Sequence, residues 1–434
     1  MKISLYNNIL KTGDNISLVY NALSDKYVAT TKPINLAEHT RPELICNETL
    51  RSELQNIGFW VNDDVNEPEQ VRELIRKHDH SLDAYHLHIN PTVDCNFRCW
   101  YCYEDHTSGS RMKAETVQAI QKLIEKKIKD TPELSVIHLS FFGGEPLMGY
   151  ENVVKPLMTY TKEVCQANGI QYTCHFTTNG FLINERMLNF FKENQASFQI
   201  TLDGHRDRHD KVRFTTNGKG SYDRIVHNII ELATRQCSVL VRINFTAENI
   251  DSIPAIIDDF NNLTDEQKQY IRFDLQRIWQ DSSREIDEKI TGKIADYQKT
   301  LRDIGFEVSF YRTHDAVRNS CYGDKRNYQL INYDGGVFLC TARDFDEAHR
   351  AGTIRADGSI EWINNAHECR LSAKFSKPVC HTCRIAPICG GGCCTQALEH
   401  PEPVKCIYGY DDEQLDAIIA TRFEQLYMLN PKQP

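Results

Sequence analysis

The stretch CNFRCWYCYED, residues 95–105, decides the fold, because it places three cysteines within eight residues. Disulfides cannot pair Cys95, Cys99 and Cys102 completely, since three is an odd number and such close neighbours close only strained loops. A closed zinc site would need a fourth ligand. Three thiolates can instead hold three irons of a [4Fe–4S] cube and leave the fourth iron open to a ligand. The spacing therefore indicates a metal or iron–sulfur loop.

The chain contains 16 cysteines, and most of them are clustered. Cys46, Cys165, Cys174 and Cys237 are scattered, whereas the other twelve fall at 95–102 and 321–406. The N-terminus lacks the apolar run of a signal peptide, and no stretch approaches the roughly 20 apolar residues of a membrane span. We therefore predict a cytoplasmic protein without a membrane partner. Thiols stay reduced in that compartment, so clustered cysteines indicate metal or iron–sulfur binding.

Length and composition limit the possibilities further. A chain of 434 residues predicts two or three domains, and a hydrophobic content of 41% is typical of globular proteins. The formal net charge is −10. A nucleic-acid binder normally presents a basic face, so we predict no nucleic-acid partner.

Residues 1–84 contain no clustered cysteine and predict a small α+β module. ISLYNNIL and ISLVYNAL are typical of two strands joined by the turn KTGDN, and residues 48–61 predict a helix, ended by Gly58, and a short strand. Residues 66–78 predict another helix. The module is either a cap on the main domain or a winged-helix-like platform for a peptide. An edge strand could bind an extended peptide by β-augmentation.

Strands and helices alternate through residues 85–305. The predicted strands are AYHLHIN, VIHLSFF, QYTCHFTT, SFQITL, VLVRINFT and IRFDLQRI. Six alternations favour a parallel sheet covered by helices, either a barrel or an open doubly wound sheet. Sites in such folds lie at the carboxyl ends of the strands. The three-cysteine stretch directly follows the first strand, so it is predicted to lie at that edge.

The ends of the next strands carry glycine and polar residues. The second strand ends in Gly143-Gly144-Glu145-Pro146, where two glycines permit a tight turn, Glu145 supplies a carboxylate and Pro146 fixes the exit. The third and fourth strands end in FTTNG, with Thr178 and Asn179, and in ITLDG, with Thr201 and Asp203. Arg213, Arg242, Gln276 and Arg277 also lie near predicted strand ends. A guanidinium group there suits a ligand carboxylate.

These segments together resemble the radical S-adenosylmethionine (radical SAM) superfamily. The resemblance implies a partial (βα)6 barrel over residues 85–305, with a CxxxCxxC loop after its first strand and an aromatic residue, here Tyr101, before the last cysteine. It also implies that GGEP binds the ammonium of the methionine moiety. Thr178, Asn179, Thr201, Arg213 and Arg242 would line the cofactor and substrate cavity.

The chemistry that the resemblance implies is radical formation. The reduced cluster transfers one electron to the sulfonium of S-adenosylmethionine, and cleavage yields methionine and a 5′-deoxyadenosyl radical. That radical abstracts a hydrogen atom from an unactivated C–H bond of the substrate. The protein positions the cofactor and excludes water.

The second cysteine group follows the order C-x13-G-x4-C, then C-x2-C-x5-C-x3-C, then a last cysteine. A zinc ribbon could use Cys380 and Cys383 but would not explain the segment from Gly335 to Cys340. The pattern resembles the SPASM extension of peptide-modifying radical enzymes, predicted here over residues 306–410, before a closing helix over 411–434. The resemblance implies three [4Fe–4S] clusters in all. One auxiliary cluster would be held by Cys321, Cys340 and Cys393, and the other by Cys380, Cys383, Cys389 and Cys406.

The fourth ligand of the cluster at Cys321, Cys340 and Cys393 stays open. Some relatives carry an extra cysteine between the first two, and this chain has none between Cys321 and Cys340. Cys369 and Cys394 are possible substitutes. The alternative is an open iron that accepts a substrate group.

The resemblance implies a maturase of a ribosomally made (RiPP) precursor peptide with a leader, which forms a thioether or a carbon–carbon crosslink. The leader would bind the N-terminal module as a recognition element (RRE), and a flavodoxin or ferredoxin would supply electrons. The alternative is an anaerobic sulfatase-maturating enzyme. Relatives of that kind commonly place an aspartate directly after the cysteine of G-x4-C, where this chain has Thr341. Asp203 and Asp344 are the candidate catalytic residues. A hypothesis of a different kind is that the protein is a non-catalytic iron–sulfur electron carrier or a peptide-binding scaffold.

Overall fold

The computed structural model describes residues 1–12, 16–31, 34–278, 288–309, 315–402 and 404–429. The chain forms two compact units that interleave along the sequence. Unit 1 comprises Met1–Ser81, Arg312–Arg326 and His367–Pro434, and unit 2 comprises Leu82–Tyr311 and Asn327–Ala366. The predicted divisions at 84 and 305 fall close to two of these boundaries, whereas residues 327–366, predicted to lie in the cysteine-rich domain, belong to unit 2.

Unit 2 is built on an eleven-stranded sheet whose strand order is β12-β11-β10-β9-β8-β7-β6-β13-β14-β15-β16. The parallel strands are β6 (Ala84–Ile89), β7 (Val136–Phe141), β8 (Gln171–Thr178), β9 (Ser197–Leu202), β10 (Val239–Phe245), β11 (Ile271–Arg277), β12 (Glu307–Val308) and β13 (Tyr328–Ile331). An antiparallel extension follows as β14 (Gly336–Phe338), β15 (Gly352–Ile354) and β16 (Ile360–Trp362).

The six predicted strands of the parallel sheet are therefore confirmed, and so is the α/β class. Strands that follow one another in the chain are also neighbours in the sheet from β6 to β12. A doubly wound sheet would reverse its strand order at a switch point, so this order is that of a barrel. No pairing joins β12 to β16 among the described residues, and the barrel is open.

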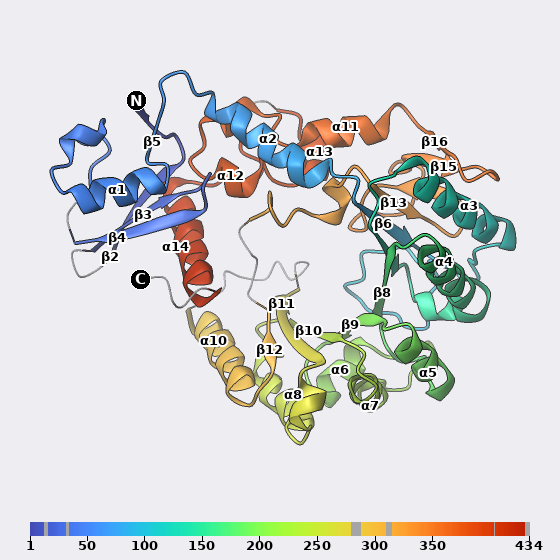
Figure 1. Ribbon diagram of the computed structural model, residues 1–434. Helices are drawn as coiled ribbons and strands as arrows, with labels where there is room; N and C mark the ends of the chain where they lie inside the picture. The colour runs from blue at the N-terminus through green and yellow to red at the C-terminus, as the bar shows by residue number, and fades with distance from the viewer. Residues whose placement is uncertain (13–15, 32–33, 279–287, 310–314, 403, 430–434) are drawn as a thin grey trace. The chain divides into compact units, whose positions relative to one another are not determined.

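Helices cover the outer face of this sheet (Figure 1). They are α3 (Ala114–Asp130), α4 (Lys155–Ala167), α5 (Glu185–Glu193), α6 (Arg206–Val212), α7 (Tyr222–Thr234), α8 (Ile253–Phe260), α9 (Asp265–Lys268) and α10 (Glu288–Asp303). Side chains alternate along each strand, so Tyr85, Leu87 and Ile89 of β6 are fully buried in the main hydrophobic core. The opposite, inner face is left for polar side chains.

The segment 327–366 joins unit 2 through backbone pairing that the sequence did not predict. Strand β13 pairs in parallel with β6, with Tyr328 opposite His86. The turn before β16 lies on α3, where Lys122 Nζ donates to the Ala356 carbonyl at 2.9 Å. This segment therefore continues the barrel sheet beyond its first strand.

Unit 1 contains a three-stranded antiparallel sheet of β2 (Asn7–Thr12), β3 (Ile16–Asn21) and β4 (Lys26–Thr30). Strand β1 (Lys2–Ile3) pairs with β5 (Trp60–Val61), and the helices are α1 (Glu48–Asn56), α2 (Glu67–Asp79), α11 (Ala366–Ala373), α12 (Ala386–Cys389), α13 (Cys394–Glu399) and α14 (Asp412–Leu429). The helix and short strand predicted over 48–61 are confirmed, and so are the helices predicted over 66–78 and at the C-terminus.

The predicted first strand over residues 3–10 is wrong in its continuity. It is split into β1 and β2, because side chains bind the chain between them: Ser4 Oγ donates to Glu67 Oε1 at 2.5 Å, and Asn7 Nδ2 donates to the Phe59 carbonyl at 2.8 Å. Strand β4 was not predicted. Residues 13–15 of the predicted turn lie outside the described residues.

One hydrophobic cluster joins the N-terminal segment to the cysteine-rich segment within unit 1. Tyr6, Tyr20 and Val71 pack with Ile388 and Ile419 in this cluster. A buried ion network adds to it, since Lys374 Nζ contacts Asp79 at 2.8 Å and Asp324 at 3.3 Å. The N-terminal elements and the cysteine-rich loops therefore share a core.

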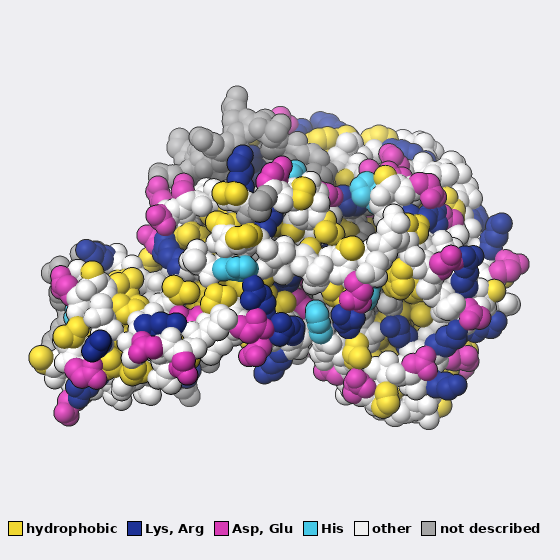
Figure 2. Space-filling view, turned by 90° about the horizontal axis from the view of Figure 1, so that it is seen from above, with side chains coloured by type: hydrophobic (Ala, Val, Ile, Leu, Met, Phe, Trp, Pro, Cys, Tyr) yellow, Lys and Arg dark blue, Asp and Glu magenta, His cyan; other side chains and the backbone are white. Residues whose placement is uncertain are grey.

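Figure 2 shows Lys and Arg side chains interspersed with Asp and Glu side chains over the face that it presents. None of the helices in the described ranges combines the length and apolarity that a membrane span requires.

Candidate active site at the carboxyl ends of the parallel strands

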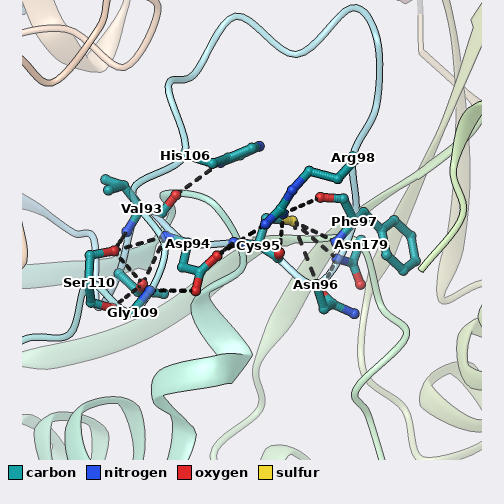
Figure 3. Close-up of polar contacts among 11 residues, drawn as sticks. Val93, Asp94, Cys95, Asn96, Phe97, Arg98, His106, Gly109, Ser110 and Asn179 are labelled. Atoms are coloured by element: carbon teal, nitrogen blue, oxygen red, sulfur yellow. Dashed lines mark hydrogen bonds and ion pairs between the residues drawn. The ribbon is translucent and has the colours of Figure 1, made fainter. Parts of the chain in front are cut away.

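The three-cysteine loop follows β6 and is closed by side-chain caps (Figure 3). Asp94 Oδ1 accepts from the Cys95 amide and Oδ2 accepts from the Gly109 amide, each at 2.8 Å. Ser110 Oγ accepts from the amides of Val93 and Asp94. These bonds satisfy backbone groups that no strand or helix pairs, so the loop has a defined entry and exit.

The cysteines differ in exposure along this loop. Cys95 is buried, Cys99 is partly buried and Cys102 is exposed, while the Cys102 amide donates to the Cys99 carbonyl at 3.1 Å. Burial, reinforced by the Glu145 carboxylate, raises the pKa of Cys95 to about 12, and burial raises the pKa of Cys102 to about 11. Without a metal the loop therefore holds neutral thiols, and binding a cluster would displace their protons.

Gly143 and Gly144 brace the segment that leads into Cys95. The Gly144 amide donates to the Thr92 carbonyl at 3.2 Å, and the Glu145 amide donates to the Asp94 carbonyl at 2.9 Å. A Cβ added to Gly144 would lie 2.2 Å from the Asp94 carbonyl oxygen, and one added to Gly143 would lie 2.4 Å from that of Thr92. The glycine pair is therefore required for close backbone approach.

Glu145 is fully buried and ties the ends of two strands together. Its Oε1 accepts from the Leu147 amide and from Thr178 Oγ1, and its Oε2 accepts from the Asn179 amide, at 2.7–2.9 Å. Burial raises the pKa of Glu145, and these three hydrogen bonds oppose the rise. Pro146 then begins a short 3-10 helix, Pro146–Gly149. The Glu145 carboxylate is thus hydrogen-bonded within the protein. Binding of a ligand ammonium group by the segment Gly143–Pro146 stays a prediction.

Asn179 carries this connection on to the cysteine loop. Its Nδ2 donates to Asn96 Oδ1 at 2.8 Å and lies 3.9 Å from Cys95 Sγ (Figure 3). The Asn96 carbonyl accepts from the Thr216 amide at 3.0 Å. Three segments that are distant in the chain therefore meet around Cys95.

A second group of contacts holds the other end of the loop. The Tyr101 hydroxyl donates to Asp203 Oδ2 at 2.5 Å and accepts from Arg213 Nη1 at 2.7 Å. Asn244 Nδ2 lies 3.3 Å from the same hydroxyl. Burial raises the pKa of Asp203, opposed by the Arg213 guanidinium. Burial acts against the Arg213 charge too, but Tyr101, Cys99 and Asp203 raise its pKa above the usual value.

Thr201 and Arg242 lie side by side on the inner face of the sheet. They are register partners in β9 and β10, and Arg242 is in turn paired with Asp274 of β11. Arg242 Nε donates to Asn244 Oδ1 at 3.0 Å, and Gln276 Nε2 donates to Asp274 Oδ1 at 2.8 Å. The predicted cofactor and substrate residues of these strands thus form one polar wall.

Four buried polar atoms beside the loop have no hydrogen-bond partner within the described part of the chain. They are Asp203 Oδ1, Arg213 Nε, Asn96 Nδ2 and Asn90 Oδ1. A native interior rarely leaves such atoms unpaired, so each of them can bind a polar ligand group. The sequence analysis missed Asn90 and Asn96, although Asn90 is the last residue of a predicted strand and Asn96 directly follows Cys95.

Glu104 was also missed. Burial, with Asp344 nearby, raises the pKa of Glu104 to about 8, and its Oε2 has no hydrogen-bond partner among the described residues. The Tyr103 hydroxyl donates to the Thr341 carbonyl at 2.9 Å. The residues after Cys340, including the candidate Asp344, therefore lie against the three-cysteine loop. The sequence CYED places the Glu104 carboxylate near the cysteines, but only the fold shows that it lies near Asp344.

Four cysteines of the second group meet within unit 1. The charges of Cys383, Cys380 and Cys406 add to burial in raising the pKa of Cys389 to about 12. Gly390, Gly391 and Gly392 all have positive φ, and a Cβ on Gly391 would lie 2.8 Å from the Phe375 amide nitrogen. The glycine run therefore permits the tight return between Cys389 and Cys393.

The other predicted auxiliary set stays a prediction. Cys321 and Cys393 lie in unit 1, whereas Cys340 lies in unit 2. Of the two possible substitutes, Cys369 is exposed and Cys394 is buried beside Asp324. No three His, Cys, Asp or Glu side chains among the described residues are arranged to hold a single metal ion. A [4Fe–4S] cluster does not require such a group, because its thiolates bind separate irons.

Comparison with known proteins identifies the family. A profile of the Radical SAM superfamily matches residues 89–260. The chain is 32% identical over 334 residues to a cysteine-type anaerobic sulfatase-maturating enzyme of Clostridium novyi (strain NT), spanning 69% of this chain and 85% of the relative. The chain belongs to the radical SAM superfamily. Within it, the relatives place the chain among maturases of the SPASM type.

Solved structures of other proteins show the same fold. The structure of native anSMEcpe with bound AdoMet and Cp18Cys peptide matches with a TM-score of 0.59 at 17% identity, over 80% of this chain and 98% of that one. Streptococcus suis SuiB bound to the precursor peptide SuiA matches with a TM-score of 0.52 at 14% identity, over 93% of this chain and 97% of that one.

Membership of the radical SAM superfamily implies an enzyme that uses S-adenosylmethionine and a [4Fe–4S] cluster, and the residues present fit both groups. Three thiols on one loop match a cluster with an open iron. The unpaired carboxylate oxygen of Asp203 and the unpaired nitrogens of Arg213 and Asn96 match the hydroxyl, amine and carboxylate groups of the nucleoside and amino acid.

Proposed function

We propose that this radical SAM enzyme is a maturase of a ribosomally made precursor peptide, in which it forms a thioether or a carbon–carbon crosslink. The supporting observation is the extent of the structural match. SuiB, whose solved structure contains a precursor peptide, matches over 93% of this chain, whereas the anSMEcpe match spans 80%. A peptide-maturase assignment therefore accounts for more of this chain, which shares one core between its N-terminal and cysteine-rich segments.

When bound at the cysteine loop, the reduced cluster and S-adenosylmethionine supply a 5′-deoxyadenosyl radical that abstracts a hydrogen atom from the substrate. The chain's own residues orient the reactants. Asp203, Arg213 and Asn96 offer hydrogen bonds to the cofactor at the strand ends. Thr201 and Arg242 line the inner wall, where a peptide side chain would enter.

A crosslink is a net oxidation, so the product radical must lose an electron. We propose that Cys380, Cys383, Cys389 and Cys406 would hold one auxiliary cluster and Cys321, Cys340 and Cys393 another. These would supply an acceptor for that electron and would make three clusters in all. A flavodoxin or ferredoxin would reduce the first cluster. Asp203 or Asp344 would accept the substrate proton.

We also propose where the leader binds. Strand β4 lies at one edge of the sheet β2-β3-β4, and an extended leader would add a strand there by backbone hydrogen bonds. Leader affinity would then be independent of the radical chemistry in unit 2.

The second candidate is an anaerobic sulfatase-maturating enzyme, which oxidises a cysteine or serine to formylglycine. The 32% identity to the Clostridium novyi enzyme favours it. Thr341 stands where such enzymes commonly have an aspartate, but Asp344 lies near the loop through Glu104. Mass spectrometry separates the candidates: a crosslink only removes a pair of hydrogen atoms, whereas formylglycine formation from cysteine removes two hydrogen atoms and also exchanges the sulfur for an oxygen.

The test of radical chemistry is S-adenosylmethionine cleavage by anaerobically reconstituted protein with dithionite. We expect release of 5′-deoxyadenosine, and we expect Cys99→Ala to abolish it because one iron loses its thiolate. The exposed, unclustered Cys46 provides the matched control, Cys46→Ala, which should retain cleavage. No release from protein with verified clusters would favour the electron carrier or scaffold.

A further inference from the structure

Within the described part of the chain, Tyr101 is the only residue of the three-cysteine loop whose side chain hydrogen-bonds to all of three places: the end of β9, strand β10 and the end of α6. Its hydroxyl meets Asp203 just after β9, Asn244 in β10 and Arg213 just after α6. Asp203 is 1% exposed and Arg213 is 8% exposed. The tyrosine lies between Cys99 and Cys102, so its position sets the position of both thiols.

The partners of Tyr101 are themselves held from behind by His209. The Asp203 amide donates to His209 Nδ1 at 3.2 Å, so this histidine is neutral with its proton on Nε2. That nitrogen lies 3.0 Å from Ser221 Oγ, which donates to the Arg213 carbonyl at 2.5 Å. His209 is fully buried. The histidine therefore fixes the spacing between the carboxylate and the guanidinium that flank the Tyr101 hydroxyl.

The Tyr101 hydroxyl bridges Asp203 and Arg213, which also form a direct but longer ion pair. Arg213 Nη1 lies 2.7 Å from the Tyr101 oxygen but 3.4 Å from Asp203 Oδ2, so the hydroxyl relays the contact between cation and anion. The Arg213 side chain also lies over the Phe97 ring, at 5.8 Å from its centroid. The guanidinium is thereby held against the loop, and its charge acts on Cys95, Cys99 and Cys102.

We infer that Tyr101 is a positioning residue: its hydroxyl, clamped between Asp203 and Arg213 with His209 behind them, fixes the three-cysteine loop and the buried cation beside its cluster. This goes beyond an aromatic ring that covers the cluster, because the hydroxyl rather than the ring makes the contacts. The inference concerns the loop and its cluster and does not depend on which peptide the enzyme modifies.

The first test uses the full-length protein without clusters and without substrate. In Tyr101→Phe only the hydroxyl is lost. We expect hydrogen exchange of the backbone amides in peptides covering 96–103 to accelerate by about tenfold or more, the effect of losing a hydrogen bond to charged partners. The matched control is Tyr103→Phe, which removes the neighbouring hydroxyl that bonds the neutral Thr341 carbonyl and should accelerate exchange in peptides covering 96–103 less than Tyr101→Phe does.

The second test uses the reconstituted protein and the reduced-state EPR signal that changes when S-adenosylmethionine is added, which marks the open-iron cluster. We expect Tyr101→Phe to shift the midpoint potential of this signal, and Arg213→Gln to lower it because a buried cation near the cluster is lost. His209→Gln should also shift the midpoint potential. The shift should be smaller when His209→Gln is added to Tyr101→Phe than when it is made in the wild type, because both substitutions act through the same group of residues.

The outcomes are distinct. Unchanged exchange in the loop and an unchanged potential in Tyr101→Phe would overturn the inference, even if peptide modification were intact. Equal acceleration throughout the chain would show general destabilisation and would also overturn it. Absence of peptide modification by the wild-type protein, with altered exchange and potential in Tyr101→Phe, would count against the proposed function and leave this inference standing.

Discussion

Gly144 shows at the residue scale how strictly the site restricts a single side chain. Its Cα faces the backbone of Val93 and Asp94, which leads into Cys95, and its amide donates to the Thr92 carbonyl. The sequence motif indicates a tight turn, but a turn alone would tolerate alanine at a glycine without positive φ. The contact across to the cysteine loop is what excludes a Cβ.

We therefore predict that Gly144→Ala destabilises the protein by about 1–3 kcal/mol, because the added methyl group forces the two backbones apart. Urea unfolding of the cluster-free protein measures this. Gly292→Ala, in helix α10 where an added Cβ has no described atom within 4 Å, should be neutral or slightly stabilising. Equal midpoints for both variants would contradict the close packing.

His209 gives a pH prediction at the same scale. Burial holds the pKa of His209 well below its usual value, so the folded state keeps it neutral while the unfolded chain takes up a proton. Stability is therefore present above the unfolded pKa of about 6.5 and is lost as the pH falls below it, by up to about 1.4 kcal/mol per pH unit.

His209→Gln should accordingly show a shallower loss of stability between pH about 6.5 and 5 than the wild type, measured as the urea midpoint at each pH. His349→Gln, at an exposed histidine, is the control and should follow the wild-type slope. A wild-type slope in His209→Gln would show that this residue is not held neutral.

At the scale of elements, the strands of the parallel sheet could be predicted because successive side chains alternate between the hydrophobic core and the inner face of the sheet. The period-two patterns of β6 and β10 put Leu87 and Val241 in the core and leave Arg242 on the inner face. Strand β4 and the split between β1 and β2 were not readable. The split depends on Glu67 and Phe59, which lie more than fifty residues from Ser4 and Asn7 in the chain.

The loop elements of unit 1 lead to a prediction about iron content. Cys389 ends α12 beside Cys380, Cys383 and Cys406, so its thiolate belongs to the proposed auxiliary cluster there. Cys389→Ala should lower the iron and sulfide of the reconstituted protein by about four atoms each per chain, since one [4Fe–4S] cube is lost.

Cys46→Ala is the control for this measurement, because Cys46 is exposed and lies outside both cysteine groups. Iron content equal to that of the wild type in Cys389→Ala would remove Cys389 from the ligand set.

For the molecule as a whole, the chain passes between its two units four times. Residues 312–326 and 367–434 return to the N-terminal segment, where Lys374 lies 2% exposed between Asp79 and Asp324. Arg422 similarly meets Asp25 and, at 3.1 Å, Asp315. These buried pairs link three chain segments within unit 1, so the N-terminal module shares a core with the cysteine-rich segment in addition to its own cluster around Leu54 and Phe59.

We predict that Lys374→Met lowers the stability of unit 1 by about 3–5 kcal/mol, because two buried carboxylates lose their cation. Limited proteolysis and thermal unfolding measure it, with cleavage expected first in unit 1. Lys299→Ala, which removes an exposed pair with Asp303 on α10, should change stability by no more than about 0.5 kcal/mol. Identical behaviour of the two variants would contradict a shared core.

Resemblance to a known superfamily implied the barrel order of the strands. By itself the sequence determined the α/β class, the six strands of the parallel sheet and the three-cysteine loop after the first of them. Each of these follows from local spacing and periodicity, which short stretches of chain carry. Only the tertiary structure decided that β13 extends the sheet beside β6, that residues after Cys340 meet Glu104, and that Tyr101 bonds Asp203 and Arg213. Those contacts join residues about a hundred or more positions apart, and only chain packing brings such groups within hydrogen-bonding distance.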